Sequence, residues 1–154
     1  MKILFICTHN RCRSILAEAI ANHFGEGIIT AASAGSDPAG KVHPRTLEAL
    51  AARNIPVAGL TSKSWDTLED FKPDVVITVC DNAAREQCPV WLGDVTRAHW
   101  GLADPSAIEG DHDNVMAAFN GTIDMLIDRV AFLSGFLEQN PDKAQLQMRL
   151  KSWQ

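Results

Sequence analysis

The sequence has no tyrosine and only four cysteines in 154 residues. Four cysteines are too few for a disulfide scaffold in a chain of this length, so each thiol is expected to be reduced unless its chemistry is redox. An excess of basic residues is also absent: 14 Lys and Arg against 19 Asp and Glu give a net charge of -5. This balance argues against a protein that binds nucleic acid or anionic membranes.

Long hydrophobic segments are missing as well. The apolar opening Ile3–Ile6 passes at once into polar residues, which is too short for a signal-peptide core or a membrane span. We therefore expect a cytoplasmic protein. No repeat, low-complexity tract or linker interrupts the chain, so residues 1–154 are predicted to form one domain, with about 141–154 as a C-terminal extension. A monomer is the default expectation for a chain this small.

Short apolar runs alternate with helical patterns along the chain. Strands are predicted at 2–6, 28–33, 74–79 and 95–100, and helices at 14–24, from Pro44 to about Asn54, and at 115–137. His43 precedes Pro44 and is expected to cap that second helix. A last short helix is expected around Leu146, Leu150 and Trp153. The alternation predicts an α/β domain with a parallel sheet.

Two cysteines follow predicted strands. Cys7 follows the strand at 2–6, and Cys80 follows the strand at 74–79. Ligands of open parallel sheets bind beyond the carboxyl ends of the strands. We therefore expect both thiols on the same rim of the sheet, where the ligand binds.

The segment from Cys7 to Ser14 joins the first strand to the first helix. A loop in this position can point successive backbone N–H groups at one centre and so bind a tetrahedral oxyanion. Its members are predicted to line the anion site: Thr8, His9, Asn10, Arg11, Cys12 and Arg13. Arg13 can clamp two anion oxygens, and the same field, with the Ser14 hydroxyl, would lower the pKa of Cys7.

A cysteine, five further residues and then Arg-Ser, directly after the first strand, resembles the phosphate-binding loop of the low-molecular-weight protein tyrosine phosphatase superfamily. Ser33-Ala34-Gly35 and Asp104-Pro105 fit the same resemblance. It implies a four-stranded parallel sheet with helices on both faces. It also implies that Cys7 is the nucleophile, Arg13 the anion clamp, Ser14 the supporting hydroxyl, Asp104 the general acid and Asn10 the residue that shapes the loop.

This superfamily contains both phosphatases and arsenate reductases. The phosphatases usually carry aromatic residues after Asp-Pro, whereas Ser106-Ala107-Ile108 follows here. Cys80, Cys88 and His99-Trp100-Gly101 resemble the redox-coupled arsenate reductases, which implies a relay in which Cys7 attacks arsenic, Cys80 attacks Cys7, and Cys88 attacks Cys80. A phosphatase that hydrolyses phosphate monoesters, and a protein that binds oxyanions such as phosphate or sulfate without turnover, remain alternatives.

The resemblance also bears on cofactors and partners. Seven residues separate Cys80 from Cys88, one more than in the thioredoxin-coupled members, which leaves the external thiol reductant open between thioredoxin and glutathione or glutaredoxin. Some members bind potassium through residues that match Asn10, Glu18 and Ser33. Here the ammonium group of Lys63 is expected to take the place of the ion, and no metal or bound cofactor is predicted.

The other candidates have simpler interpretations. Cys12 is expected to pack inside the loop, with an off-path disulfide to Cys7 as the alternative. His9 and Arg11 are expected at the anion entrance or in solvent, without a catalytic role. A structural zinc site is not expected, because such sites usually have two to four residues between paired cysteines. The four residues between Cys7 and Cys12 barely meet this range, and the seven between Cys80 and Cys88 miss it.

Overall fold

The computed structural model describes residues 1–85 and 89–152. In this part of the chain, four parallel strands form one sheet in the order β2-β1-β3-β4. The strands are β1 (Lys2–Ile6), β2 (Thr30–Ala34), β3 (Val75–Thr78) and β4 (Thr96–His99). The central strands β1 and β3 are almost entirely buried, as expected for continuous apolar runs in a sheet covered on both faces. The predicted α/β class and four-stranded parallel sheet are confirmed.

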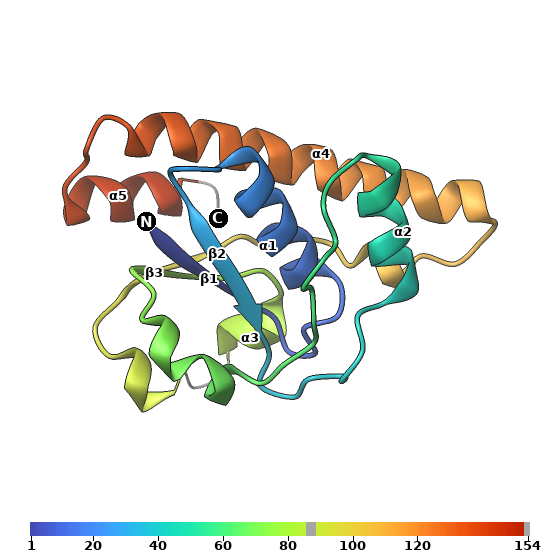
Figure 1. Cartoon of the computed structure of the whole chain (residues 1–154), viewed down its shortest axis with the longest axis horizontal. Helices are drawn as coiled ribbons and strands as arrows, with labels where there is room; N and C mark the ends of the chain where they lie inside the picture. The colour runs from blue at the N-terminus through green and yellow to red at the C-terminus, as the bar shows by residue number, and fades with distance from the viewer. Residues whose placement is uncertain (86–88, 153–154) are drawn as a thin grey trace.

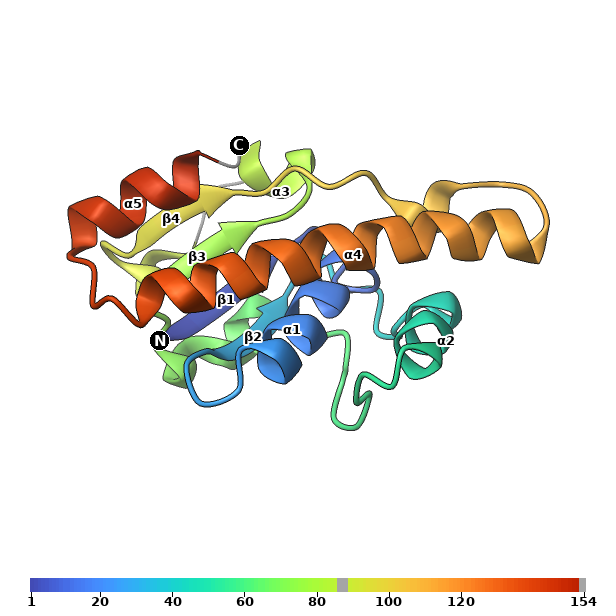
Figure 2. The same cartoon turned by 90° about the horizontal axis from the view of Figure 1, so that it is seen from above.

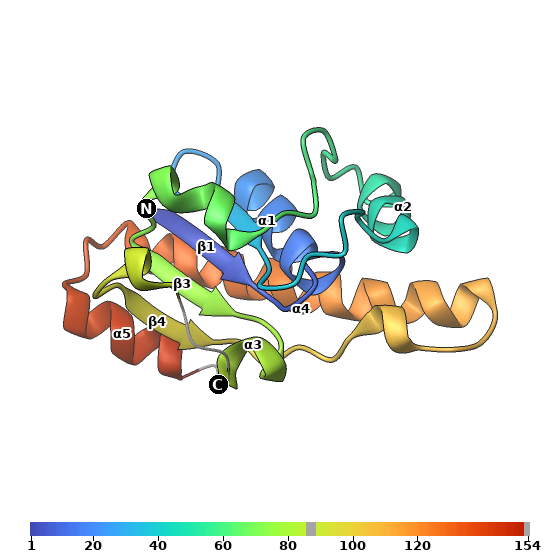
Figure 3. The ribbon, with the colours of Figure 1, turned by 90° about the horizontal axis from the view of Figure 1, so that it is seen from below.

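Helices cover both faces of this sheet. They are α1 (Arg13–Phe24), α2 (Pro44–Ala52), α3 (Asp81–Arg85), α4 (His112–Leu137) and α5 (Lys143–Lys151), with short 3-10 helices η1 (Trp65–Phe71), η2 (Val90–Leu92) and η3 (Pro105–Ala107). α1 and α4 lie over one face (Figures 1 and 2), whereas η1 and α3 lie over the other, which faces the viewer in Figure 3. None of the described helices is both long and apolar enough to cross a membrane.

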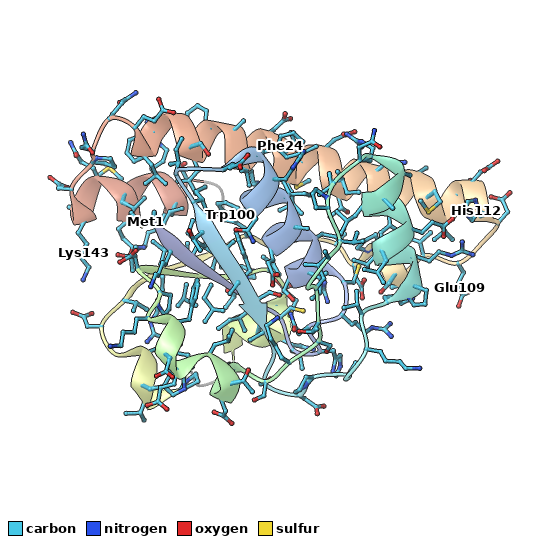
Figure 4. All side chains as sticks on the ribbon, in the orientation of Figure 1. Met1, Phe24, Trp100, Glu109, His112 and Lys143 are labelled. Carbon is cyan, nitrogen blue, oxygen red and sulfur yellow. The ribbon has the colours of Figure 1, made fainter. Side chains whose placement is uncertain are left out.

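The core lies between the sheet and the apolar stripe of α4. Phe119, Ile123 and Leu126 recur at steps of four and three residues and are fully buried, which is the period of one helix face. Trp100, just after β4, is fully buried too and packs against Phe5 of β1 with ring centroids 5.9 Å apart. Figure 4 labels Trp100 within the body of the molecule.

The predicted start of α2 agrees with its observed cap, whereas α4 begins at His112, three residues before the predicted start, because the Asp111 side chain caps it. The Nδ1 atom of His43 accepts a hydrogen bond from the backbone N–H of Arg45 at 3.1 Å, which confirms the predicted cap of α2. Burial and the nearby charge of Arg11 lower the pKa of His43, so its imidazole stays neutral and keeps a lone pair for this bond.

Other boundaries differ from the prediction. β2 begins at Thr30 and not at Ile28, because the backbone N–H groups of Ile28 and Ile29 both donate to the carbonyl of Gly25 in the turn after α1. The short segments η1, α3, η2 and η3 were not predicted, because runs of three to seven residues carry too few turns for a period to be read.

The C-terminal segment packs against the edge strand. Leu146 and Leu150 of α5 are buried, and the side-chain N–H of Gln147 donates to the backbone carbonyl of Arg97 in β4 at 2.7 Å. Figure 2 shows α5 alongside β4. The predicted last helix is therefore confirmed over Lys143–Lys151, while Trp153 lies outside the described residues.

Candidate active site

Several carbonyl groups of the loop that links β1 to α1 point away from the centre of the loop and accept hydrogen bonds from the chain around it. The carbonyls of Thr8, His9 and Arg11 accept hydrogen bonds from the backbone N–H groups of residues 37, 39 and 43, each at 2.9 Å. The described chain contains no cis peptide, so the C=O of one residue and the N–H of the next point in opposite directions. The N–H groups that follow these three carbonyls consequently face the inside of the loop, where an anion can bind.

Asn10 fixes the shape of this loop. Its φ angle is +47°, a left-handed conformation that asparagine adopts more readily than most residues. Its buried side-chain amide donates to the hydroxyl oxygens of Ser14 at 2.8 Å and Ser33 at 3.0 Å, and its side-chain oxygen accepts from the backbone N–H of Lys63 at 2.9 Å. One side chain thus connects the loop to α1, β2 and the segment before η1.

Gly35 lets a neighbouring segment approach the loop. A Cβ atom at this position would lie 2.4 Å from the carbonyl oxygen of Thr8 and 2.9 Å from that of Cys7. Both distances are shorter than real Cβ contacts, so a larger residue here would displace the start of the loop.

Cys7 is buried at the base of the loop. Its sulfur lies 3.2 Å from the Ser14 hydroxyl oxygen, and because that oxygen already accepts from Asn10, its own proton is free to point at the sulfur. A hydrogen bond to Cys80, and then burial, raise the pKa of Cys7, while Ser14 lowers it. The pKa of Cys7 is thus raised, and not lowered as the sequence predicted, because the contact with Cys80 and burial outweigh the effect of the Ser14 hydroxyl. The Cys7 thiol is therefore the proton donor of the pair.

Cys80 is brought to the same place by the sheet. β1 and β3 are hydrogen-bonded neighbours, with Ile6 in register with Thr78, so the residues that follow both strands lie on one rim, as predicted. The hydrogen bond from Cys7 lowers the pKa of Cys80 to about 5, aided by the backbone N–H groups of Ala83 and Thr8 and opposed by burial. The two sulfurs thus share one proton and hold one negative charge.

Arg13 and Asp104 close another side of the site. One guanidinium nitrogen of Arg13 donates to the carbonyl of Leu102 at 3.1 Å, and the other lies 3.8 Å from the Asp104 carboxylate. The other oxygen of that carboxylate accepts from the backbone N–H and the hydroxyl of Ser106, at 2.9 and 2.6 Å. Both charged groups are therefore oriented by neighbours before any anion binds.

Lys63 is connected to the loop through Glu18 and Ser33. Its ammonium nitrogen lies 3.6 Å from the carboxylate of Glu18, which accepts at 2.6 Å from the Ser33 hydroxyl that Asn10 contacts. The same nitrogen donates to the carbonyl of Thr61 at 3.0 Å. The ammonium group thus lies beside Glu18, one of the three residues that match potassium ligands by the resemblance. Within the described residues, no group of three His, Cys, Asp or Glu side chains is placed to hold a metal ion.

The remaining predicted residues are also located. Cys12 is buried, and burial raises its pKa to about 11 although Thr46 hydrogen-bonds to it, so its thiol stays protonated at neutral pH. His9 contacts the Asp37 carbonyl at 3.0 Å, and Arg11 is exposed at the mouth. Cys88 lies outside the described residues.

These side chains surround a small pocket. Its volume is ≈ 50 Å³, several times the ~10–15 Å³ that one water molecule needs, so a compact oxyanion fits in it. The lining comprises Cys7, Thr8, His9, Arg11, Cys12, Arg13, Cys80, Asn82 and Asp104. Asn82 was missed by the sequence analysis, although its place two residues after Cys80 on the same rim was a signal for it.

Comparison with known proteins agrees with this geometry. Residues 2–145 match the low molecular weight phosphotyrosine protein phosphatase family, and the chain belongs to this family. The match includes all four strands, the loop at Cys7 and Asp104, and it ends in the first turn of α5.

Three of the similar proteins carry the name arsenate reductase. An arsenate reductase from Bacillus licheniformis is 35% identical over 129 residues, which are 83% of this chain and 91% of that protein. A solved arsenate reductase in a phosphate-binding state is 27% identical with a TM-score of 0.71, over 87% of this chain and 96% of that one. A thioredoxin-dependent arsenate reductase from Corynebacterium glutamicum is 28% identical with a TM-score of 0.60, over 85% of this chain and 62% of that one.

Proposed function

We propose that this protein reduces arsenate to arsenite, with Cys7 as nucleophile and Cys80 as the second thiol. One observation carries the proposal: Cys7 and Cys80, which follow the neighbouring strands β1 and β3, both line the same small pocket. Reduction of As(V) to As(III) takes two electrons, which two adjacent thiols supply when they become a disulfide. A phosphatase needs no second thiol at this position. The relatives at 35% and 27% identity are arsenate reductases, which supports this choice.

Arsenate binds in the loop at Cys7. The inward N–H groups and the Arg13 guanidinium supply donors to its oxygens, and phosphate and sulfate share its shape and charge. When the anion binds, the Arg13 guanidinium hydrogen-bonds to it and gives up its ion pair with Asp104, which is 3.8 Å long.

In the first step Cys7 attacks arsenic. Its proton moves along the thiol hydrogen bond to Cys80, which leaves a Cys7 thiolate beside the anion. A sulfur–arsenic bond forms as an arsenic–oxygen bond breaks, and the departing hydroxide takes a proton from Asp104, which received it from the bound hydrogen arsenate, to give water. The Ser14 hydroxyl, 3.2 Å from the Cys7 sulfur, stabilises the thiolate by a charge-assisted hydrogen bond.

In the second step Cys80 attacks Cys7. A disulfide forms between them, and the electron pair of the sulfur–arsenic bond passes to arsenic, which leaves as arsenite. The proton of Cys80 goes to an arsenite oxygen. Two thiols are oxidised and arsenic is reduced by two electrons, so the step balances.

The enzyme is restored by an external thiol. Cys88 attacks Cys80, and the resulting Cys80–Cys88 disulfide is reduced by thioredoxin or, alternatively, the Cys7–Cys80 disulfide is opened by glutathione or glutaredoxin. The thioredoxin-dependent neighbour supports the first route. A cycle of this kind needs a compartment that keeps thiols reduced, which supports a cytoplasmic location.

Variants of three pocket cysteines separate reduction from phosphate-monoester hydrolysis. Cys7→Ser is expected to abolish both arsenate turnover and any hydrolysis of p-nitrophenyl phosphate. Cys80→Ala is expected to stop arsenate turnover and leave hydrolysis, because only reduction needs the second thiol. Cys12→Ala is the matched control, since it removes another buried thiol from the same pocket, and it is expected to turn over arsenate. Sustained arsenate turnover by Cys80→Ala would refute the relay and favour another role for the pocket.

A further inference from the structure

A histidine at the end of β4 connects the residues on either side of Cys80. His99 is in register with Thr78 at the end of β3, and its Nδ1 atom lies 2.8 Å from the Thr78 hydroxyl oxygen. Its Nε2 atom lies 3.0 Å from a carboxylate oxygen of Asp81, the first residue of α3. We call this arrangement of Thr78, His99 and Asp81 the His99 bridge.

The chemistry of the three groups fixes the imidazole ring. A carboxylate only accepts hydrogen bonds, so the Nε2 atom of His99 must carry a proton and donate it to Asp81. The Thr78 hydroxyl can donate to Nδ1 of the neutral ring, and it can accept from Nδ1 of the protonated ring. Gly101 is fitted closely to the bridge, because a Cβ atom there would lie 3.3 Å from the Nε2 atom.

The bridge spans the segment that carries the second thiol. Thr78 precedes Cys80 by two residues and Asp81 follows it, while the backbone N–H of Ala83 in the same turn of α3 hydrogen-bonds to the Cys80 sulfur. His99 therefore sets where α3 begins relative to the sheet, and with it the position of that sulfur. Cys7 is held separately, by Ser14 and its own loop.

We infer that His99 is a positioning residue that holds Cys80 in line for its attack on Cys7. The inference rests on the proposed function, because that attack is the second step of the reduction. A misplacement of about 1 Å in a reacting group can cost roughly 100-fold in rate. Loss of the bridge should therefore slow formation of the Cys7–Cys80 disulfide by roughly 10- to 100-fold, while anion binding in the Cys7 loop is unchanged.

The test follows disulfide formation in a single turnover. In a Cys88→Ser background, which stops the relay at Cys7–Cys80, the reduced protein is mixed with arsenate, quenched with acid at set times, alkylated and analysed by mass spectrometry. His99→Phe keeps an aromatic ring and removes both nitrogens. His99→Gln keeps an amide N–H that can reach Asp81. The matched control is His112→Phe, since His112 also pairs with a carboxylate, Glu48, at 2.6 Å, at the start of α4.

We expect His99→Phe to slow disulfide formation, His99→Gln to restore most of the rate and His112→Phe to match the parent. Phosphate affinity, measured by calorimetry, should be the same in all four proteins. If His99→Phe forms the disulfide as fast as the parent, the inference is overturned. It is also overturned if His99→Phe loses phosphate affinity together with the rate of disulfide formation, because the substitution would then disrupt the whole site. If His99→Phe fails to fold, Asp81→Ala and Asp81→Asn repeat the comparison from the other end of the bridge. Absence of any arsenate-dependent disulfide in the parent would instead refute the proposed function.

Discussion

Replacing Lys63 by methionine removes an ammonium group and keeps most of the apolar length of the side chain. The Lys63 side chain is 22% exposed and that of its partner Glu18 is 12% exposed, so water screens the pair weakly. At the observed separation of 3.6 Å, an effective dielectric constant of about 20 gives an attraction of roughly 4.6 kcal/mol. Desolvation offsets part of this, and we expect the variant to lose about 2–4 kcal/mol of unfolding free energy.

Lys143→Met is the matched control for this variant. Lys143 pairs with Asp94 at 3.8 Å, but the two side chains are 65% and 103% exposed, and an exposed pair contributes at most about 1 kcal/mol. In thermal unfolding, Lys63→Met should melt about 5–10 °C below the parent, and Lys143→Met close to it. Lys63→Met should also bind phosphate more weakly, because Glu18 holds the Ser33 hydroxyl that orients Asn10.

Lys63→Met should in addition acquire a response to potassium. Two oxygen atoms that face the ammonium group, from Glu18 and from the Thr61 carbonyl, are left without their cation, and hard cations prefer oxygen ligands. Potassium chloride should therefore raise its melting temperature more than tetramethylammonium chloride at equal ionic strength, while the parent responds equally to both. Melting of Lys63→Met within about 1 °C of Lys143→Met would refute the reasoning, because the two pairs would then be equally screened.

Three further predictions address the thiol pair, the loop and the C-terminal helix. Cys7→Ala should raise the pKa of Cys80 from about 5 towards the ordinary value near 8.5, because Cys80 loses its main hydrogen-bond donor. The rate of Cys80 alkylation, measured against pH, should then fall as the pH drops below that higher pKa. Gly35→Ala should cost about 1–3 kcal/mol of stability and weaken phosphate binding, as measured by chemical denaturation and calorimetry, whereas full stability would show that the loop can yield. Leu150→Ala should lower the free energy of unfolding by about 2–5 kcal/mol, because Leu150 is fully buried. Met148 is 74% exposed, so Met148→Ala should change that free energy by less than about 0.5 kcal/mol. Equal unfolding curves for the two variants would contradict the packing of α5.

The parts of the fold that depend on local pattern were predictable from the sequence. The apolar runs of β1 and β3, the period of α4 and the cap at His43 are each contained in a few consecutive residues. The placement of Cys7 and Cys80 on one rim followed from a general property of parallel sheets. The general position of the active site could therefore be deduced before any coordinates.

The supporting contacts could not be predicted, because they join distant parts of the chain. Asn10 meets Ser33 across 23 residues and the backbone of Lys63 across 53 residues. The contact of His99 with Asp81 depends on the register of β3 and β4 and on the start of α3, which is too short to show a helical period. Sequence motifs indicate the candidate reacting groups, whereas the residues that orient them depend on tertiary structure.

The most direct test of the account is to map thiols after one turnover. The reduced wild-type protein is incubated with one equivalent of arsenate, free thiols are blocked, and disulfides are located by mass spectrometry. If the relay operates, two thiols are lost for each arsenate reduced and Cys80 is joined to Cys88. A disulfide that stays between Cys7 and Cys80 would preserve the reduction and assign its resolution to glutathione or glutaredoxin. Retention of all thiols in the presence of arsenate would contradict the central claim and favour a phosphatase.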